Sequence, residues 1–288
     1  MNSSPQRGLI ETLAFGFSTI HRRTFLLLTP IFIDLFLWFG PKSTIAPLLL
    51  SDPAVTSIDN NGITSLLGML NVWGLLAFQI PTVVGYTTIE ISPVIIGQMD
   101  LHSWLVVIPL VTILAIFGIL FSCVYRSMIA SAIKTEPSSR NALMARVILA
   151  WLRFSVLAIT ILCIPLMMIA LIQMGYAVIA SLLTIPILIA AFYAFFTIDA
   201  LFVSNVGPKT AFQFAHLVVK KHFRAALGIF LVVTLISLGM ALIWASLAMN
   251  SIGTLTAIVG NAYVATGLTA SSMVFYQDRI STVQAQEG

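Results

Sequence analysis

Six long apolar runs, separated by segments that hold most of the charge, constrain this sequence more than any other feature. They cover residues about 24–40, 102–124, 149–172, 177–203, 223–248 and 254–276. A helix that crosses a bilayer needs about 20 apolar residues, so each run is a candidate span. Of the 288 residues, 59% are hydrophobic and 8% are charged, whereas soluble domains carry about 25% charged residues. The sequence therefore predicts an all-α integral membrane protein with six transmembrane helices in a single polytopic domain, 1–288.

The distribution of basic residues predicts the topology. With six spans, 13 of the 14 basic residues fall on one side of the membrane and only Lys42 falls on the other. If the ambiguous segment 62–84 also crossed, every later loop would change sides and this asymmetry would be lost. Cytoplasmic loops carry the excess of Lys and Arg, so we expect both termini in the cytoplasm. We expect 62–84 to be re-entrant or surface-lying, with a seventh span as the alternative.

The basic residues also indicate a partner. In this topology they form a ring at the inner membrane surface, where anionic lipid headgroups attract Lys and Arg. The ring argues against nucleic acid as the partner, despite the sequence pI of about 9.3. The residues that we expect to face headgroups are Arg22, Arg23, Lys220, Lys221 and Arg224.

A weak internal repeat divides the chain into three helical hairpins. Each hairpin follows a stretch with apolar residues at helical spacing and a basic end: 11–23, 140–153 and 209–224. This pattern is typical of amphipathic helices that lie in the membrane interface, so we expect three of them on the cytoplasmic side. The first hairpin is interrupted by residues 41–101, which we expect to form an apolar, extracytoplasmic helical insertion. Such an insertion is a candidate site for a membrane-protein partner.

A second possible repeat competes with the first. IDLFLWFGPKS, residues 33–43, resembles IDALFVSNVGPKT, residues 198–210. This match would suit an inverted repeat of three plus three spans, which is found in many transporters. It rests on Gly and Pro residues that end helices on either side of a membrane.

The stretch TIDALFVSNVGPKTAFQFAHLVVKKHFRAALGIFLVV, residues 197–233, resembles a group of poorly characterised prokaryotic six-span proteins. The group includes the membrane domain of some glycerophosphodiester phosphodiesterases and related stand-alone proteins of unknown function. The shared features are an acid that ends span four, a short basic amphipathic helix, and span five. The resemblance covers roughly 120–250 and the N-terminal helix, and it implies a prokaryotic plasma (inner) membrane. The phosphodiesterase domain has no counterpart here, so the resemblance does not imply that activity.

Two aspartates lie inside apolar runs, where a charged side chain is costly and faces protein or water. Asp199 lies near the inner end of span four, at a depth similar to that of Arg153 in span three. We expect Arg153 and Asp199 to form a structural ion pair, with Lys209 and Arg126 as alternative partners of the aspartate.

Asp34 is the better candidate for a functional polar group, because no basic residue lies within its own helical turn. His102, at the outer end of span two, is its expected partner. Asn261 adds an amide in the middle of span six, on a helix with many small residues. Asp34, His102 and Asn261 therefore make up the candidate polar site.

Sequence motifs for known membrane-enzyme chemistry are absent. The chain has no HExxH, P-loop or CxxC motif, and Asp34 and Asp199 would lie at different depths. Cys123 and Cys163 fall in apolar runs as small hydrophobes, and we expect no metal or cofactor. We therefore expect a non-enzymatic scaffold or accessory subunit that binds lipid or another membrane protein. The alternative is a transporter or permease for a lipidic or small hydrophobic compound, with Asp34 and Asn261 along the path.

Overall fold

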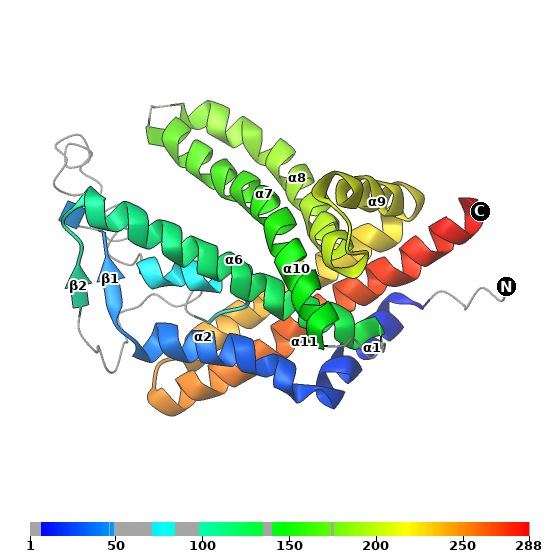
Figure 1. Cartoon of the computed structure of the whole chain (residues 1–288), viewed down its shortest axis with the longest axis horizontal. Coiled ribbons are helices and arrows are strands. Elements are labelled where there is room, and N and C mark those ends of the chain that lie inside the picture. The colour runs from blue at the N-terminus through cyan, green and yellow to red at the C-terminus, as the bar shows by residue number, and fades with distance from the viewer. Residues whose placement is uncertain are drawn as a thin grey trace. The chain divides into compact units, whose positions relative to one another are not determined.

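The described part of the chain folds almost entirely into helices, as expected for an all-α membrane protein (Figure 1). The computed structural model describes residues 7–45, 47–48, 71–83, 98–134, 140–173 and 176–287. The α-helices are α1 (Leu9–Arg22), α2 (Leu28–Phe39), α6 (Trp104–Lys134), α7 (Arg140–Gln173), α8 (Ala177–Val203), α9 (Pro208–Lys221), α10 (Phe223–Leu247) and α11 (Ser251–Glu287). Two 3₁₀ helices, η1 (Thr24–Leu27) and η2 (Val72–Ala77), and two short strands, β1 (Lys42–Thr44) and β2 (Gln98–Asp100), complete the described elements.

The chain divides into two compact units. Unit 1 consists of residues 1–23, 126–235 and 267–288, and unit 2 consists of residues 24–125 and 236–266. Helices α6, α10 and α11 contribute residues to both units. The sequence distributes its charge very unevenly between the two. Unit 1 holds 13 of the 14 basic and five of the ten acidic residues, a formal charge of +8, whereas unit 2 has a formal charge of −4.

Four of the six expected spans coincide with helices that are long and apolar enough to cross a membrane. These helices are Trp104–Lys134, Ser181–Val203, Phe223–Leu247 and Ser251–Gln284. Their outward surfaces are rich in large apolar side chains, such as Leu105, Leu182 and Leu242, which are 87%, 70% and 76% exposed. A soluble protein rarely exposes so much apolar surface, and hydrocarbon is the solvent that suits it.

The first expected span, 24–40, is broken. Its first four residues form η1, and α2 then continues for only 12 residues, Leu28–Phe39. Pro30 falls in the first turn of α2, where a missing backbone N–H does little harm. The apolar stretch Thr24–Phe39 is shorter than the four long candidates.

The second expected surface helix is not separate from its span. Residues 140–153 and the span 149–172 belong to one continuous helix, α7, of 34 residues. No helix-breaking residue lies between the two predicted parts, so the backbone hydrogen bonds continue across the expected boundary. The prediction of a separate surface helix is therefore wrong for residues 140–153.

The other two surface stretches, α1 and α9, match each other closely. Each has 14 residues and begins after an extended glycine, Gly8 or Gly207. Each ends at a residue that leaves the helical region, Arg23 or His222. Counted from the cap glycine, both helices bury the residues 4, 8, 11 and 12 positions on: Thr12, Gly16, Thr19 and Ile20 in α1, and Ala211, Ala215, Val218 and Val219 in α9. The two helices are therefore equivalent copies of one structural module.

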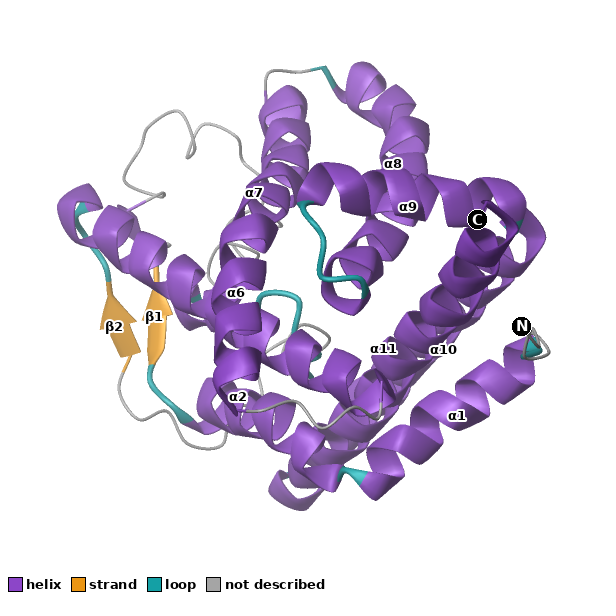
Figure 2. Cartoon of the chain, turned by 45° about the vertical axis from the view of Figure 1, so that its right-hand side comes forward, coloured by secondary structure: helices purple, strands orange, loops and turns teal. Residues whose placement is uncertain are grey.

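The described parts of the expected insertion, 41–101, belong to unit 2 and contain elements that the sequence did not predict. Strands β1 and β2 pair in parallel, with Ser43 opposite Met99 (Figure 2). Asn71 Oδ1 accepts hydrogen bonds from the backbone N–H groups of Ser43 (3.2 Å) and Trp73 (3.3 Å), which ties η2 to β1. Of the ambiguous segment 62–84, residues 71–83 form η2 and a turn, and the remainder lies outside the described residues.

Helix η2 packs directly on α6. An added Cβ on Gly118 would collide with the carbonyl oxygen of Leu75, so only glycine permits this approach. Val72 and Leu101 join Val107 and Leu114 of α6 in one buried apolar cluster. This part of the insertion is thus an integral layer of unit 2.

Candidate functional site

Asp199 of α8 is buried in unit 1 and pairs with α6. The Arg126 Nη1 atom lies 3.8 Å from Asp199 Oδ1, and both side chains are largely buried. Arg153, the partner that the sequence favoured, instead donates through Nη1 to the carbonyl oxygen of Asn205, at 2.8 Å. The partner of Asp199 is therefore Arg126, the alternative, and not Arg153.

The end of α8 is tied to several neighbouring helices. Asp199 contacts α6 and Asn205 contacts α7 through the bonds just described. The hydroxyl groups of Ser204 and Tyr276, which belongs to α11, lie 2.9 Å apart and share a hydrogen bond. Asn205 adopts a positive φ of 52°, a conformation that asparagine tolerates better than most residues. These contacts fix the turn between α8 and α9, so Asp199 has a structural role here.

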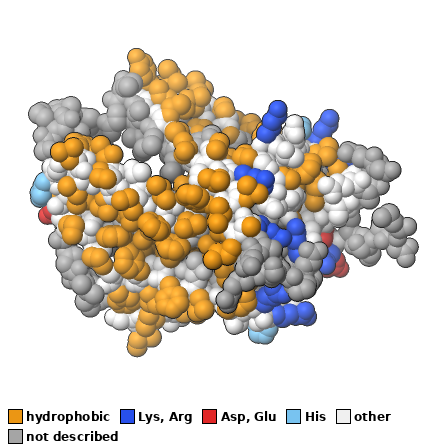
Figure 3. Space-filling view, viewed as in Figure 1, with side chains coloured by type: hydrophobic (Ala, Val, Ile, Leu, Met, Phe, Trp, Pro, Cys, Tyr) orange, Lys and Arg blue, Asp and Glu red, His pale blue; other side chains and the backbone are white. Residues whose placement is uncertain are grey.

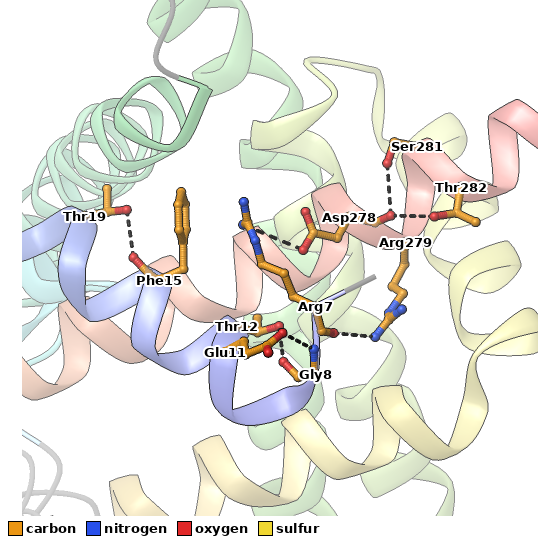
Figure 4. Close-up of polar contacts among 10 residues, drawn as sticks. All are labelled: Arg7, Gly8, Glu11, Thr12, Phe15, Thr19, Asp278, Arg279, Ser281 and Thr282. Carbon is orange, nitrogen blue, oxygen red and sulfur yellow. Dashed lines mark hydrogen bonds and ion pairs between the residues drawn. The ribbon is translucent and has the colours of Figure 1, made fainter. Parts of the chain in front are cut away.

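A second polar cluster joins the start of α1 to α11 (Figure 4). The Arg7 Nη1 atom lies 3.7 Å from Asp278 Oδ2, and Arg279 Nη2 donates to the carbonyl oxygen of Arg7 at 3.1 Å. The Arg7 guanidinium also lies over the Phe15 ring, 3.9 Å from its centroid. This cluster was not among the expected sites, although the adjacent charges in QDRI, residues 277–280, interrupt an apolar helix and were a usable signal.

Close packing accompanies these polar contacts. An added Cβ on Gly16 would collide with Ser271 of α11, and one on Gly267 would collide with the Phe17 ring. Ser271 Oγ also donates to the carbonyl oxygen of Leu13, at 3.3 Å. Small residues let the backbones of α1 and α11 approach closely. The module α1 is therefore held by direct packing as well as by Arg7.

The residues expected to face headgroups lie at corresponding ends of the two equivalent modules. Arg22, Lys220, Lys221 and Arg224 are exposed, and Arg23 is half-buried. His222 follows Lys221, and burial, aided by the nearby positive charges of Arg279 and Lys221, lowers the pKa of its imidazole below the usual value. His222 is therefore neutral near pH 7, and the lysines and arginines supply the positive charge.

Asp34 of α2 is fully buried in unit 2 and holds a loop. The backbone N–H of Val83 approaches both carboxylate oxygens of Asp34, at 2.9 Å and 3.0 Å. The His102 side chain, its expected partner, is exposed. The acid inside the first apolar run thus receives a backbone donor from a residue 49 positions later in the chain.

Asn261 of α11 is buried as expected, and its Nδ2 atom has no hydrogen-bond partner among the described residues. The Nε1 atoms of Trp38 and Trp244, two tryptophans of unit 2, are also buried and have no hydrogen-bond partner among the described residues. The structure therefore separates the expected trio: Asp34 and Asn261 are buried in unit 2, whereas His102 is exposed. No sequence pattern indicated that the tryptophans belong to this site.

Comparison with known proteins adds no family assignment. No protein-family model matches the chain, and neither a curated protein nor a solved structure is significantly similar to it.

Proposed function

We propose that this chain is a non-enzymatic membrane protein that acts as a scaffold or accessory subunit and binds anionic lipid headgroups through unit 1. The observation that carries the proposal is the charge difference between the units, +8 for unit 1 and −4 for unit 2. Basic residues near a membrane surface attract anionic lipids by about 1 kcal/mol each. Unit 1 is thus suited to the lipid-facing cytoplasmic surface.

The two equivalent modules give this charge a defined position. Both α1 and α9 bury one face of small or apolar residues and end in basic residues, Arg22 in one and Lys220 and Lys221 in the other. Interfacial helices bind membranes by the same combination of apolar contact and basic ends. Large apolar side chains are exposed over much of the face drawn in Figure 3, and Lys and Arg side chains gather over parts of unit 1. We propose that both modules lie at the cytoplasmic interface.

The same charge bias supports the complete topology that we propose. Six spans with both termini in the cytoplasm of a prokaryotic cell place 13 of the 14 basic residues inside, in agreement with the positive-inside rule. The insertion 41–101, which lies within the net negative unit 2, would then face outward, where it is the proposed contact for another membrane protein.

Mass spectrometry of the protein extracted in a mild detergent or polymer tests the lipid proposal. We expect anionic phospholipid to remain bound to the native protein. The double substitution Lys220→Gln and Lys221→Gln removes about 2 kcal/mol of attraction, so retention of anionic lipid should fall about 30-fold. Lys42→Gln, which changes the single basic residue of unit 2, is the matched control and should leave retention unchanged. Equal retention in the double variant and the control would refute the proposal.

A transporter or permease for a lipidic or small hydrophobic compound is the second candidate function. It is favoured by polar groups in the apolar core of unit 2, where Asn261 Nδ2 has no hydrogen-bond partner among the described residues. Uptake of candidate compounds into vesicles that contain the purified protein would test it. An Asn261→Leu variant should lower the rate of uptake if this group contacts the transported compound.

A further inference from the structure

We propose that the core of unit 2 binds an apolar, membrane-soluble molecule whose polar end carries uncharged oxygen atoms. These oxygen atoms accept hydrogen bonds from the protein. The binding groups are the indole N–H groups of Trp38 and Trp244 and the side-chain amide of Asn261. This inference deepens the second candidate function and is independent of headgroup binding by unit 1.

The three donors are buried and unsatisfied. Trp38, Trp244 and Asn261 are 6%, 7% and 4% exposed, and the nitrogen of each has no acceptor among the described residues. A buried donor without an acceptor costs about 1–3 kcal/mol. An acceptor from outside the chain would remove this cost.

The donors belong to one region of unit 2. Trp38 of α2 and Trp244 of α10 pack in the same buried cluster, which also contains Val83. Gly260 of α11 packs against the Trp244 ring, where an added Cβ would lie 2.5 Å from the nearest ring carbon, and Asn261 is the next residue. Helices α2, α10 and α11 therefore supply the three donors.

The surroundings determine the chemical class of the ligand. Indole and amide N–H groups need oxygen acceptors, such as those of an ester, a ketone or a hydroxyl group. The other residues of the cluster are apolar and include Ala257 and Ile258, which suits a hydrocarbon body. Asp34 lies one helical turn before Trp38, and its carboxylate would repel a phosphate or another anion. The ligand that fits is an uncharged amphiphile with a small oxygen-bearing end.

Mass spectrometry of the extracted full-length protein, with attention to uncharged apolar molecules, is the first test. We expect one such molecule to be enriched on the native protein, and its retention to fall about tenfold in Asn261→Leu and in Trp244→Phe, which each remove one hydrogen bond. Trp151→Phe is the matched control, because Trp151 Nε1 is also buried without a partner but belongs to unit 1. Equal retention in all three variants overturns the proposal.

A second measurement on the unsubstituted protein covers the case in which the variants fail to fold. The indole ¹⁵N–¹H resonances of the five tryptophans report hydrogen bonding directly. Stripping the bound molecule with excess detergent should shift the resonances of Trp38 and Trp244 and leave that of Trp151 in place. Unchanged resonances would overturn the proposal. Loss of anionic lipid in the Lys220 and Lys221 variant bears only on unit 1, so the two proposals fail separately.

Discussion

Replacing Asp34 by alanine should release the turn that contains Val83. The carboxylate accepts the Val83 N–H at 2.9 Å and 3.0 Å in a fully buried setting. A hydrogen bond to a charged group contributes about 1.5–3 kcal/mol. If exchange of the Val83 amide with solvent requires this bond to open, its loss should accelerate exchange roughly 10- to 140-fold.

Hydrogen exchange followed by mass spectrometry of a peptide that contains Val83 measures this change. Asp34→Asn is the matched variant, because its amide oxygen still accepts the bond without the charge. Its exchange should accelerate only about fivefold, which corresponds to about 1 kcal/mol. Exchange of Val83 at the native rate in Asp34→Ala would show that the carboxylate does not hold this loop, and the assignment of Asp34 as its anchor would be wrong.

Three further predictions concern stability, measured as the thermal midpoint of the detergent-solubilised protein. Arg126→Met removes the cation beside the buried Asp199 carboxyl and should cost about 1–3 kcal/mol, and adding Asp199→Leu should recover most of the loss; no recovery would contradict the pairing. Gly118→Ala forces a Cβ onto a backbone oxygen and should cost about 1–3 kcal/mol, whereas Gly74→Ala, which meets open space, should change stability by less than about 0.5 kcal/mol. Because the pKa of His222 is lowered in the folded protein, the unfolded chain binds more protons than the folded protein as the pH falls, and stability should decline below about pH 6.5. His222→Gln should reduce that decline. Identical pH profiles for the variant and the unsubstituted protein would show that His222 does not cause it.

Much of the helical framework was predictable because apolar length and charge act locally. The start of α9 at Pro208 follows from a residue that suits a first helical turn, and four long apolar runs are long apolar helices. The break at Thr24–Leu27 was not predictable, because nothing in that apolar stretch marks a helix end. The pairing of β1 with β2 joins residues more than 50 positions apart, and no local pattern encodes it.

The partner of Asp199 shows a different limit. Counting residues from the helix ends placed Arg153 and Asp199 at a similar depth in the membrane. The predicted ion pair between them rested on this depth alone. Pairing also depends on the direction in which each side chain leaves its helix, which is set by tertiary packing. Arg153 reaches Asn205, and the Asp199 carboxylate faces Arg126 of α6. A sequence gives the depth of a residue in a helix more readily than the neighbour that the residue faces.

The bond between Asp34 and Val83 has a consequence for biosynthesis. The donor is made 49 residues after the acceptor, which at about 5–20 residues per second corresponds to roughly 2–10 seconds of translation. During this interval the Asp34 carboxylate lacks the Val83 donor that it contacts in the folded protein. The contact between α2 and the turn at Val83 can therefore form only after the chain has been made through Val83. The packing of α2 within unit 2 thus depends on a segment that is made several seconds after the helix itself.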